Sequence, residues 1–262
     1  MSTGPVVDTP SALEFQREIM ERISPEGLRA IAVDLQYKSA ALGGLLSGDP
    51  AELDRAGLRE VLRWVFATRR RADEIIDLVG ERPLGKAIGG LVNGTEAVSE
   101  RIDRFDAALR SHGLEAASNR AVFDLPGELL HFTEPDRYWL WTRWIWDPAT
   151  GTGALGLLTT DGLDLDKLAG KGATYLTVGR ATAFVDETGK AAGFTAFGPG
   201  LFGVDVLLAA VYGIYMYTVL QMRMTREFNR VLPPLPELVR RLLGVGHRRP
   251  RTCLSVAGRS RP

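Results

Sequence analysis

Apolar residues recur at helical spacing along most of the first half of the chain. The pattern predicts helices over residues 11–112, because residues three or four apart share one face of a helix. Two of the predicted buried stripes are long: Leu58, Leu62, Val65, Phe66, Ile75, Ile76 and Val79 form one, and Val98, Ile102, Phe105 and Leu109 form the other. The sequence therefore predicts a mainly α fold.

Local signals predict where these helices begin and end. Side chains that cap helices, followed by an acid or by proline, predict starts at Ser11, Ser24, Asp49 and Thr95. Pro83 predicts the end of the helix that carries the first stripe, and Pro126-Gly127 predicts a break in the next helical pattern.

The middle of the chain, residues 113–172, holds an unusual cluster of aromatic residues. Four of the five tryptophans lie in the stretch "WLWTRWIW", residues 139–146. A helix there would place Trp139, Arg143 and Trp146 on one face, with Trp141 and Trp144 on another. A strand would also present aromatic rings on both sides. Either geometry predicts a segment between two layers, with Trp141 and Trp144 in the core.

Three uses of this cluster follow from its chemistry. The indoles could anchor the core, they could stack on the bases of single-stranded nucleic acid, or they could line a ligand pocket. For the pocket we nominate Trp139, Arg143 and Trp146 with the nearby His131 and Glu134. An arginine beside indoles is suited to an anionic or planar ligand.

The C-terminal part, residues 173–244, is again helical in pattern. Residues 173–196 fit a helix and also a hairpin, and the helical surroundings favour the helix. Residues 200–222 are apolar with one charge, Asp205, and their length admits a membrane span. We expect instead a helix buried in the core of a bundle, in which Asp205 must cap the helix or pair with a cation. Pro236 predicts the start of a last short helix.

These segments suggest one helical domain over residues 11–244, a multi-helix bundle with a short Trp-rich insert that admits a small β-hairpin. N-terminal helices fill residues 11–112, the Trp-rich segment follows, and C-terminal helices fill residues 173–244. We expect a disordered N-terminus over 1–10 and a basic disordered tail over 245–262, where glycine, proline and serine interrupt any periodicity.

Composition adds expectations about location. The single cysteine, Cys253, excludes a disulfide within the chain, and the N-terminus lacks the basic and apolar regions of a signal peptide. Both features favour the cytoplasm. The excess of arginine over lysine is typical of a GC-rich, bacterial genome.

Charge is balanced overall but not along the chain. Residues 223–262 contain ten arginines and two glutamates, a net charge of +8, which leaves −8 on the rest. A basic arm can bind nucleic acid, and the residues that would do so are Arg240, Arg241, Arg248, Arg249 and Arg251. The run Arg69-Arg70-Arg71 we interpret as an ion-pair face with Asp73, Glu74 and Asp77 rather than as a phosphate site.

Motifs for catalysis are missing. A G-x-G-x-x-G pattern at Gly198, Gly200 and Gly203 lacks the acidic residue that follows in dinucleotide-binding folds. We expect no catalytic residues, no metal and no cofactor, and an enzyme is not the favoured class. The sequence favours a helical accessory protein that binds a protein partner or a small ligand. Nucleic-acid binding through the C-terminus and membrane association through residues 200–222 are the alternatives.

Overall fold

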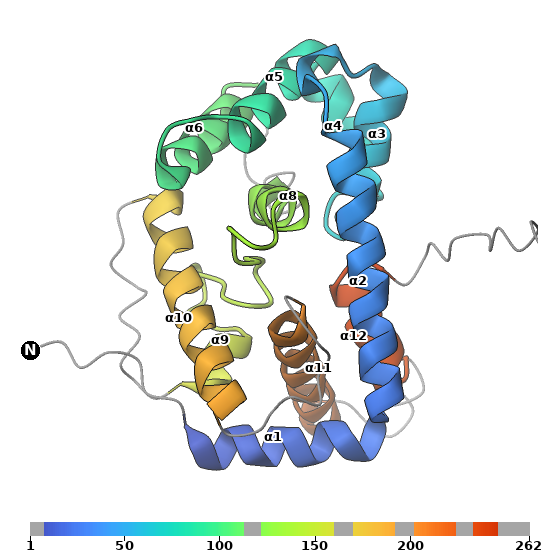
Figure 1. The fold of residues 1–262 in the computed structure, drawn as a ribbon, viewed down its shortest axis with the longest axis vertical. Coiled ribbons are helices and arrows are strands. Elements are labelled where there is room, and N and C mark those ends of the chain that lie inside the picture. The colour runs from blue at the N-terminus through green and yellow to red at the C-terminus, as the bar shows by residue number, and fades with distance from the viewer. Residues whose placement is uncertain (1–7, 113–121, 160–169, 192–201, 224–232, 246–262) are drawn as a thin grey trace, which may run out of the picture.

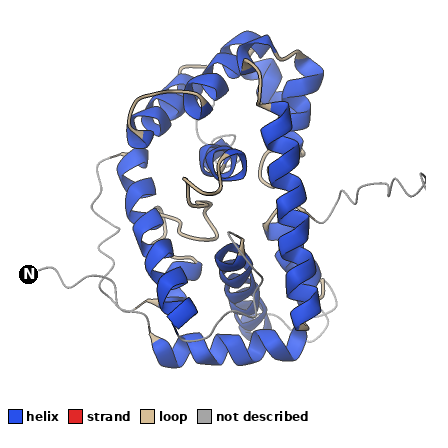
Figure 2. Ribbon diagram, viewed as in Figure 1, coloured by secondary structure: helices blue, strands red, loops and turns tan. Residues whose placement is uncertain are grey.

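A computed structural model of the chain describes residues 8–112, 122–159, 170–191, 202–223 and 233–245. In these ranges all regular structure is helical, and helices are joined by loops without a strand (Figure 2). The mainly α prediction is confirmed. The described part of the Trp-rich segment contains no hairpin, only an isolated antiparallel bridge between Asp147 and Thr152.

In the view of Figure 1 several helices form a frame, with α8 and α11 inside its outline. Helices α2 (Pro25–Leu45) and α10 (Lys171–Ala191) are its long sides, α1 (Thr9–Arg22) crosses one end, and α5 (Glu81–Val92) and α6 (Val98–Arg110) close the other. Helix α8 (Leu125–Thr133) lies between the sides. The remaining elements are η1 (Pro50–Glu52), α3 (Arg55–Trp64), α4 (Ala72–Val79), α9 (Ala154–Leu158), α11 (Gly203–Arg223) and α12 (Leu235–Leu242).

Helix α2 follows its sequence signals closely. The Ser24 hydroxyl accepts the backbone N–H of Gly27 at 3.1 Å and caps the helix, with Pro25 in the first turn, as predicted. Its buried face repeats at helical spacing and consists of Leu28, Ile31, Ala32, Leu35, Lys38 and Leu42. A lysine therefore stands in a row of core positions.

The first helix begins earlier than predicted. Asp8 is the N-cap, and its carboxylate accepts from both the backbone N–H and the hydroxyl of Ser11. Ser11 is therefore a donor within the first turn and not the cap. Residues 9 and 10 belong to α1, which corrects the expectation of a disordered N-terminus over 1–10.

The long apolar stripe is divided between two helices, α3 and α4. They are separated by a turn over residues 65–71, in which the buried Thr68 hydroxyl donates to the Leu62 carbonyl at 2.6 Å. Helix α4 ends at Gly80, whose φ of 86° favours glycine. Pro83 lies in the first turn of α5, where its missing N–H costs nothing, so it does not end the stripe. The predicted start at Thr95 is also wrong, because α6 begins at Val98.

Two predictions for the C-terminal half are confirmed. Residues 173–191 are helical, as α10, and α12 has Pro236 in its first turn; residues 192–196 lie outside the described ranges. No helix in the described part of the chain is long and apolar enough to cross a bilayer. Val245, which we had assigned to the tail, is buried at 7% exposure.

Helix α8 is the element that lies at the centre of the core. Every residue from Leu125 to Phe132 is buried. The predicted break at Pro126-Gly127 falls two residues earlier, at Asp124, which separates the helical residues 122–123 from α8. Pro126 lies in the first turn of α8 and Gly127 continues the helix. Helix α11, which we had expected in the centre, is buried mainly along its first half, from Val204 to Val211.

Candidate functional site

Helix α8 carries three ionisable residues in a row. Asp124 precedes its first turn, and Glu128 and His131 follow four and seven positions later, which places all three along one side of the helix. All three are buried, with exposures of 6%, 3% and 1%. Groups of this kind are rarely buried without partners, so each must be paired.

Residues 138–147, to which we now restrict the name Trp-rich segment, supply part of that pairing by running along α8 in the opposite direction. The backbone N–H of Arg143 donates to Asp124 at 2.8 Å, and at the other end His131 Nδ1 donates to the Tyr138 carbonyl at 2.7 Å. Between these links the backbone of Trp141 approaches Gly127 so closely that a Cβ there would lie 2.1 Å from the Trp141 oxygen. Gly127 is therefore required by the contact.

The four indoles point to different neighbours. Trp139 packs on Gly179 of α10, Trp141 meets Phe123 edge-on with ring centroids 5.1 Å apart, and Trp146 lies against Gly156 of α9. Trp144 faces Tyr212 of α11, with centroids 6.4 Å apart. The segment is neither helix nor strand, so the predicted shared face of Trp139, Arg143 and Trp146 does not form.

Beneath this segment lies a fully buried ion pair. Lys38 of α2 is 2.5 Å from Glu128 and also donates to the Leu243 carbonyl at 2.9 Å, with the Phe132 ring 4.0 Å from its Nζ. Burial lowers the pKa of Lys38 and raises the pKa of Glu128, although the opposite charge of each partner acts against both shifts.

A second buried pair joins His131 to Asp205 of α11. Nε2 of the ring is 2.9 Å from Asp205 Oδ2. Asp205, which we expected to cap its helix or to pair with a cation, thus has a partner that is a cation when protonated. Burial alone disfavours the imidazolium, but the Asp205 carboxylate and the Tyr138 carbonyl together raise the pKa of His131. The Tyr138 carbonyl can only accept, so Nδ1 carries a proton.

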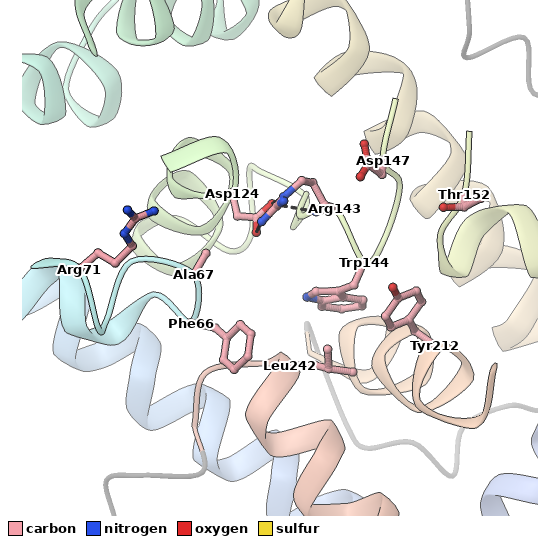
Figure 3. Close-up of a pocket in the computed structure, with 10 residues that line it drawn as sticks. All are labelled: Phe66, Ala67, Arg71, Asp124, Arg143, Trp144, Asp147, Thr152, Tyr212 and Leu242. Carbon is pink, nitrogen blue, oxygen red and sulfur yellow. Dashed lines mark hydrogen bonds and ion pairs between the residues drawn. The ribbon is translucent and has the colours of Figure 1, made fainter. Parts of the chain in front are cut away.

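A pocket of about 500 Å³ opens at the Asp124 end of this row (Figure 3). Its walls come from the turn 65–71, the N-cap of α8, the loop that contains Arg143 to Thr152, α11 and α12. The lining residues are Phe66, Ala67, Arg71, Asp124, Arg143, Trp144, Asp147, Thr152, Tyr212 and Leu242. The volume is within the range of small-molecule sites, which is roughly 300–1,000 Å³.

The polar groups of the pocket are held in place by the fold. The Arg143 guanidinium is 3.4 Å from Asp124, and the two side chains face each other in Figure 3. Burial raises the pKa of Asp124 against the opposing effect of Arg143. Asp147 is fixed by its own turn, because its carboxylate accepts the backbone N–H of Ala149 at 2.9 Å. The site thus offers an aromatic wall, a guanidinium and two carboxylates.

The structure brings only one of the nominated pocket residues, Arg143, to this pocket. His131 lies deep beside Asp205, and Glu134 pairs with Arg137 at the surface, 2.8 Å away. Trp139 and Trp146 pack elsewhere. In the described ranges no three His, Cys, Asp or Glu side chains are grouped as metal ligands would be.

The nominated nucleic-acid residues are mostly engaged or outside the described ranges. Arg240 is 3.0 Å from Asp34, and Arg241 pairs with Glu237. Arg248, Arg249 and Arg251 lie outside the described ranges. The predicted ion pairs of the run Arg69-Arg70-Arg71 form only in part. Arg71 pairs with Glu74 at 2.8 Å, whereas Asp73 and Asp77 pair with arginines of α3.

Sequence reasoning missed Asp124, Tyr212, Phe66 and Lys38. A lysine on the apolar face of α2 and an acid and a histidine on an otherwise apolar α8 were the available signals. The chain matches no protein-family model, no curated protein and no solved structure. Function is therefore inferred from the geometry of the aromatic, ion-paired pocket in this mainly helical protein.

Proposed function

We propose that this protein binds a small, planar, polar ligand in the pocket between the Trp-rich segment and α11. The observation that carries the proposal is the joint position of Arg143, Trp144 and Tyr212 in the wall of one cavity. The rings of Trp144 and Tyr212 lie at 42° to each other and both line the cavity, so a planar ligand could pack against either ring. Arg143 and Asp147 then offer a donor and an acceptor for groups on the edge of that ring.

Apolar and aromatic walls with a few fixed polar groups are typical of ligand sites. The Asp124–Arg143 pair is already satisfied, and its backbone link keeps the guanidinium in place before a ligand arrives. Preorganisation of this kind reduces the entropic cost of binding. The Trp-rich segment then has two roles in one stretch of chain, because three of its indoles pack in the core and Trp144 faces the pocket.

The test compares a planar probe with its saturated counterpart. We expect 2-naphthamide to bind in ligand-observed NMR and decahydro-2-naphthamide to bind more weakly. Tyr212→Leu should weaken 2-naphthamide by about three- to tenfold, the range for one aromatic contact. Tyr215→Leu is the matched control, because Tyr215 lies on the same helix beside Tyr212 and does not line the pocket. Equal binding of both probes, or equal effects of both substitutions, would contradict the proposal.

A further inference from the structure

One edge of the pocket is formed by the turn over residues 65–71, which carries three consecutive arginines. Phe66, Ala67 and Arg71 of this turn line the cavity, and in Figure 3 they lie together at its edge. The turn is fixed by hydrogen bonds: Arg69 N–H donates to the Val65 carbonyl at 3.0 Å, and Arg71 N–H donates to the Thr68 carbonyl at 2.8 Å. These bonds fix the backbone from which the arginine side chains extend.

The Arg69 side chain packs against one of the residues that line the pocket. Its guanidinium carbon lies 4.5 Å from the centroid of the Phe66 ring, and Phe66 is itself a wall of the pocket. A guanidinium stacked on a ring keeps its N–H groups free in the plane of the stack, where an anion can accept from two of them.

The charges around Arg69 are not balanced. Arg71, Arg143, Arg240 and Arg241 each pair with an acid. Within the part of the chain that the structure describes, no carboxylate pairs with Arg69 or Arg70. Partial burial lowers the pKa of Arg69, and the nearby charges of Arg70 and Arg241 lower it further. Like charges held close together beside a cavity are a local cost that a bound anion would remove.

We propose that the ligand of this pocket carries an anionic group, a phosphate or a carboxylate, which binds to Arg69 and Arg70 while its planar part packs against Trp144 and Tyr212. The inference rests on the proposed function and adds the class of ligand. Arg71 is held by Glu74 and Arg143 by Asp124, so the two remaining arginines are the ones that recognise the anion.

Three probes that share one ring separate this inference from the proposed function: 2-naphthamide is neutral, 2-naphthoate carries a carboxylate, and 2-naphthyl phosphate carries a phosphate. We expect at least one anionic probe to bind the 262-residue chain about tenfold more tightly than the amide, the scale of one hydrogen bond to a charged group. The preference should fall as salt is raised. Comparison of the two anions then identifies which group the site takes.

Substitutions of single arginines test which side chains bind the anionic group of the probe. Arg69→Gln and Arg70→Gln should each reduce the preference for the anionic probe severalfold and leave the affinity for 2-naphthamide within about twofold. Arg180→Gln is the control, because it removes the same charge from an exposed position on α10. Equal affinities of all three probes, or an unchanged preference in Arg69→Gln, would overturn the inference while the proposed function stands. If none of the probes binds, the proposed function fails and the inference with it.

Discussion

At the scale of single residues, the costliest feature of this core is the buried pair of Lys38 and Glu128. Both side chains are removed from water, and each has lost a hydration energy that the other only partly replaces. The Leu243 carbonyl and the Phe132 ring stabilise the ammonium further. The pair therefore holds α2, α8 and the end of α12 together, but only while both partners are present.

Removal of one partner should be more harmful than removal of both. We expect Lys38→Met to lower the free energy of unfolding by about 3–5 kcal/mol, because Glu128 is left as an uncompensated buried acid. The double substitution Lys38→Met with Glu128→Leu should recover much of that loss. Chemical denaturation of the two variants measures the difference, and a double variant no more stable than the single one would refute this account.

His131 and Asp205 give the protein a pH dependence whose sign can be stated. The pKa of His131 is raised in the folded state. Its ionised form therefore contributes stability that is fully present below about pH 6.5 and is lost as the pH rises through the folded pKa. Asp205→Asn removes the charge that raises this pKa. The destabilisation caused by Asp205→Asn should then be largest near pH 6 and shrink towards alkaline pH.

Urea unfolding of the wild type and the Asp205→Asn variant across this pH range provides the measurement. Asp136→Asn is the control, since Asp136 is exposed, and its effect should be small at every pH. A penalty for Asp205→Asn that grows with pH would show that His131 is neutral in the folded protein.

At the scale of elements, α8 and the Trp-rich segment form one unit that depends on Gly127. A methyl group at this position would collide with the Trp141 backbone oxygen, which cannot move without breaking the links at Asp124 and His131. We expect Gly127→Ala to cost about 2 kcal/mol or more, as overpacking does, and to weaken 2-naphthamide binding, because Trp144 follows Trp141 on the same segment.

Gly90→Ala provides the matched control for this substitution. Gly90 lies in α5, and a Cβ there would meet nothing within 4 Å. Alanine in an open helical position should stabilise the protein by about 0.5–1 kcal/mol. Opposite signs for the two glycine substitutions in thermal unfolding would support the packing of the segment on α8, and equal signs would contradict it.

The same elements show how far local sequence predicts this structure. Helix α2, the cap at Ser24, the helical state of residues 173–191 and the start of α12 depend on spacing and on capping groups near in sequence, and all were predicted. The break between α3 and α4 was not, because it depends on the Thr68 bond to the Leu62 carbonyl and on the tertiary place of the turn. The prediction of a helix or a strand for the Trp-rich segment was wrong for a related reason. The irregular backbone of this segment is fixed by its contacts with α8 and not by its own periodicity.

At the scale of the whole molecule, the pocket combines segments that are distant in the sequence. Arg143 was predicted from its aromatic neighbours. Phe66 and Tyr212 could not be, since neither carries a local signal and they meet only when the turn 65–71 and α11 close around α8. The two buried ion pairs join residues 90 and 74 positions apart. Pairing over such separations is a property of the packed chain, and a pattern within one segment does not contain it.

The last described residues, Leu243 and Val245, are buried in the core. Two truncations test how much they contribute to stability. Removal of residues 246–262 should leave the thermal midpoint within about two degrees, because that stretch has no helical or strand periodicity. Removal of residues 243–262 should lower the midpoint by about 10 °C, since Lys38 then loses the Leu243 carbonyl and the core loses the buried side chains of Leu243 and Val245. Calorimetry of the two truncated proteins compares them directly. A large drop on removal of residues 246–262 alone would show that the basic C-terminus contributes to the stability of the folded domain.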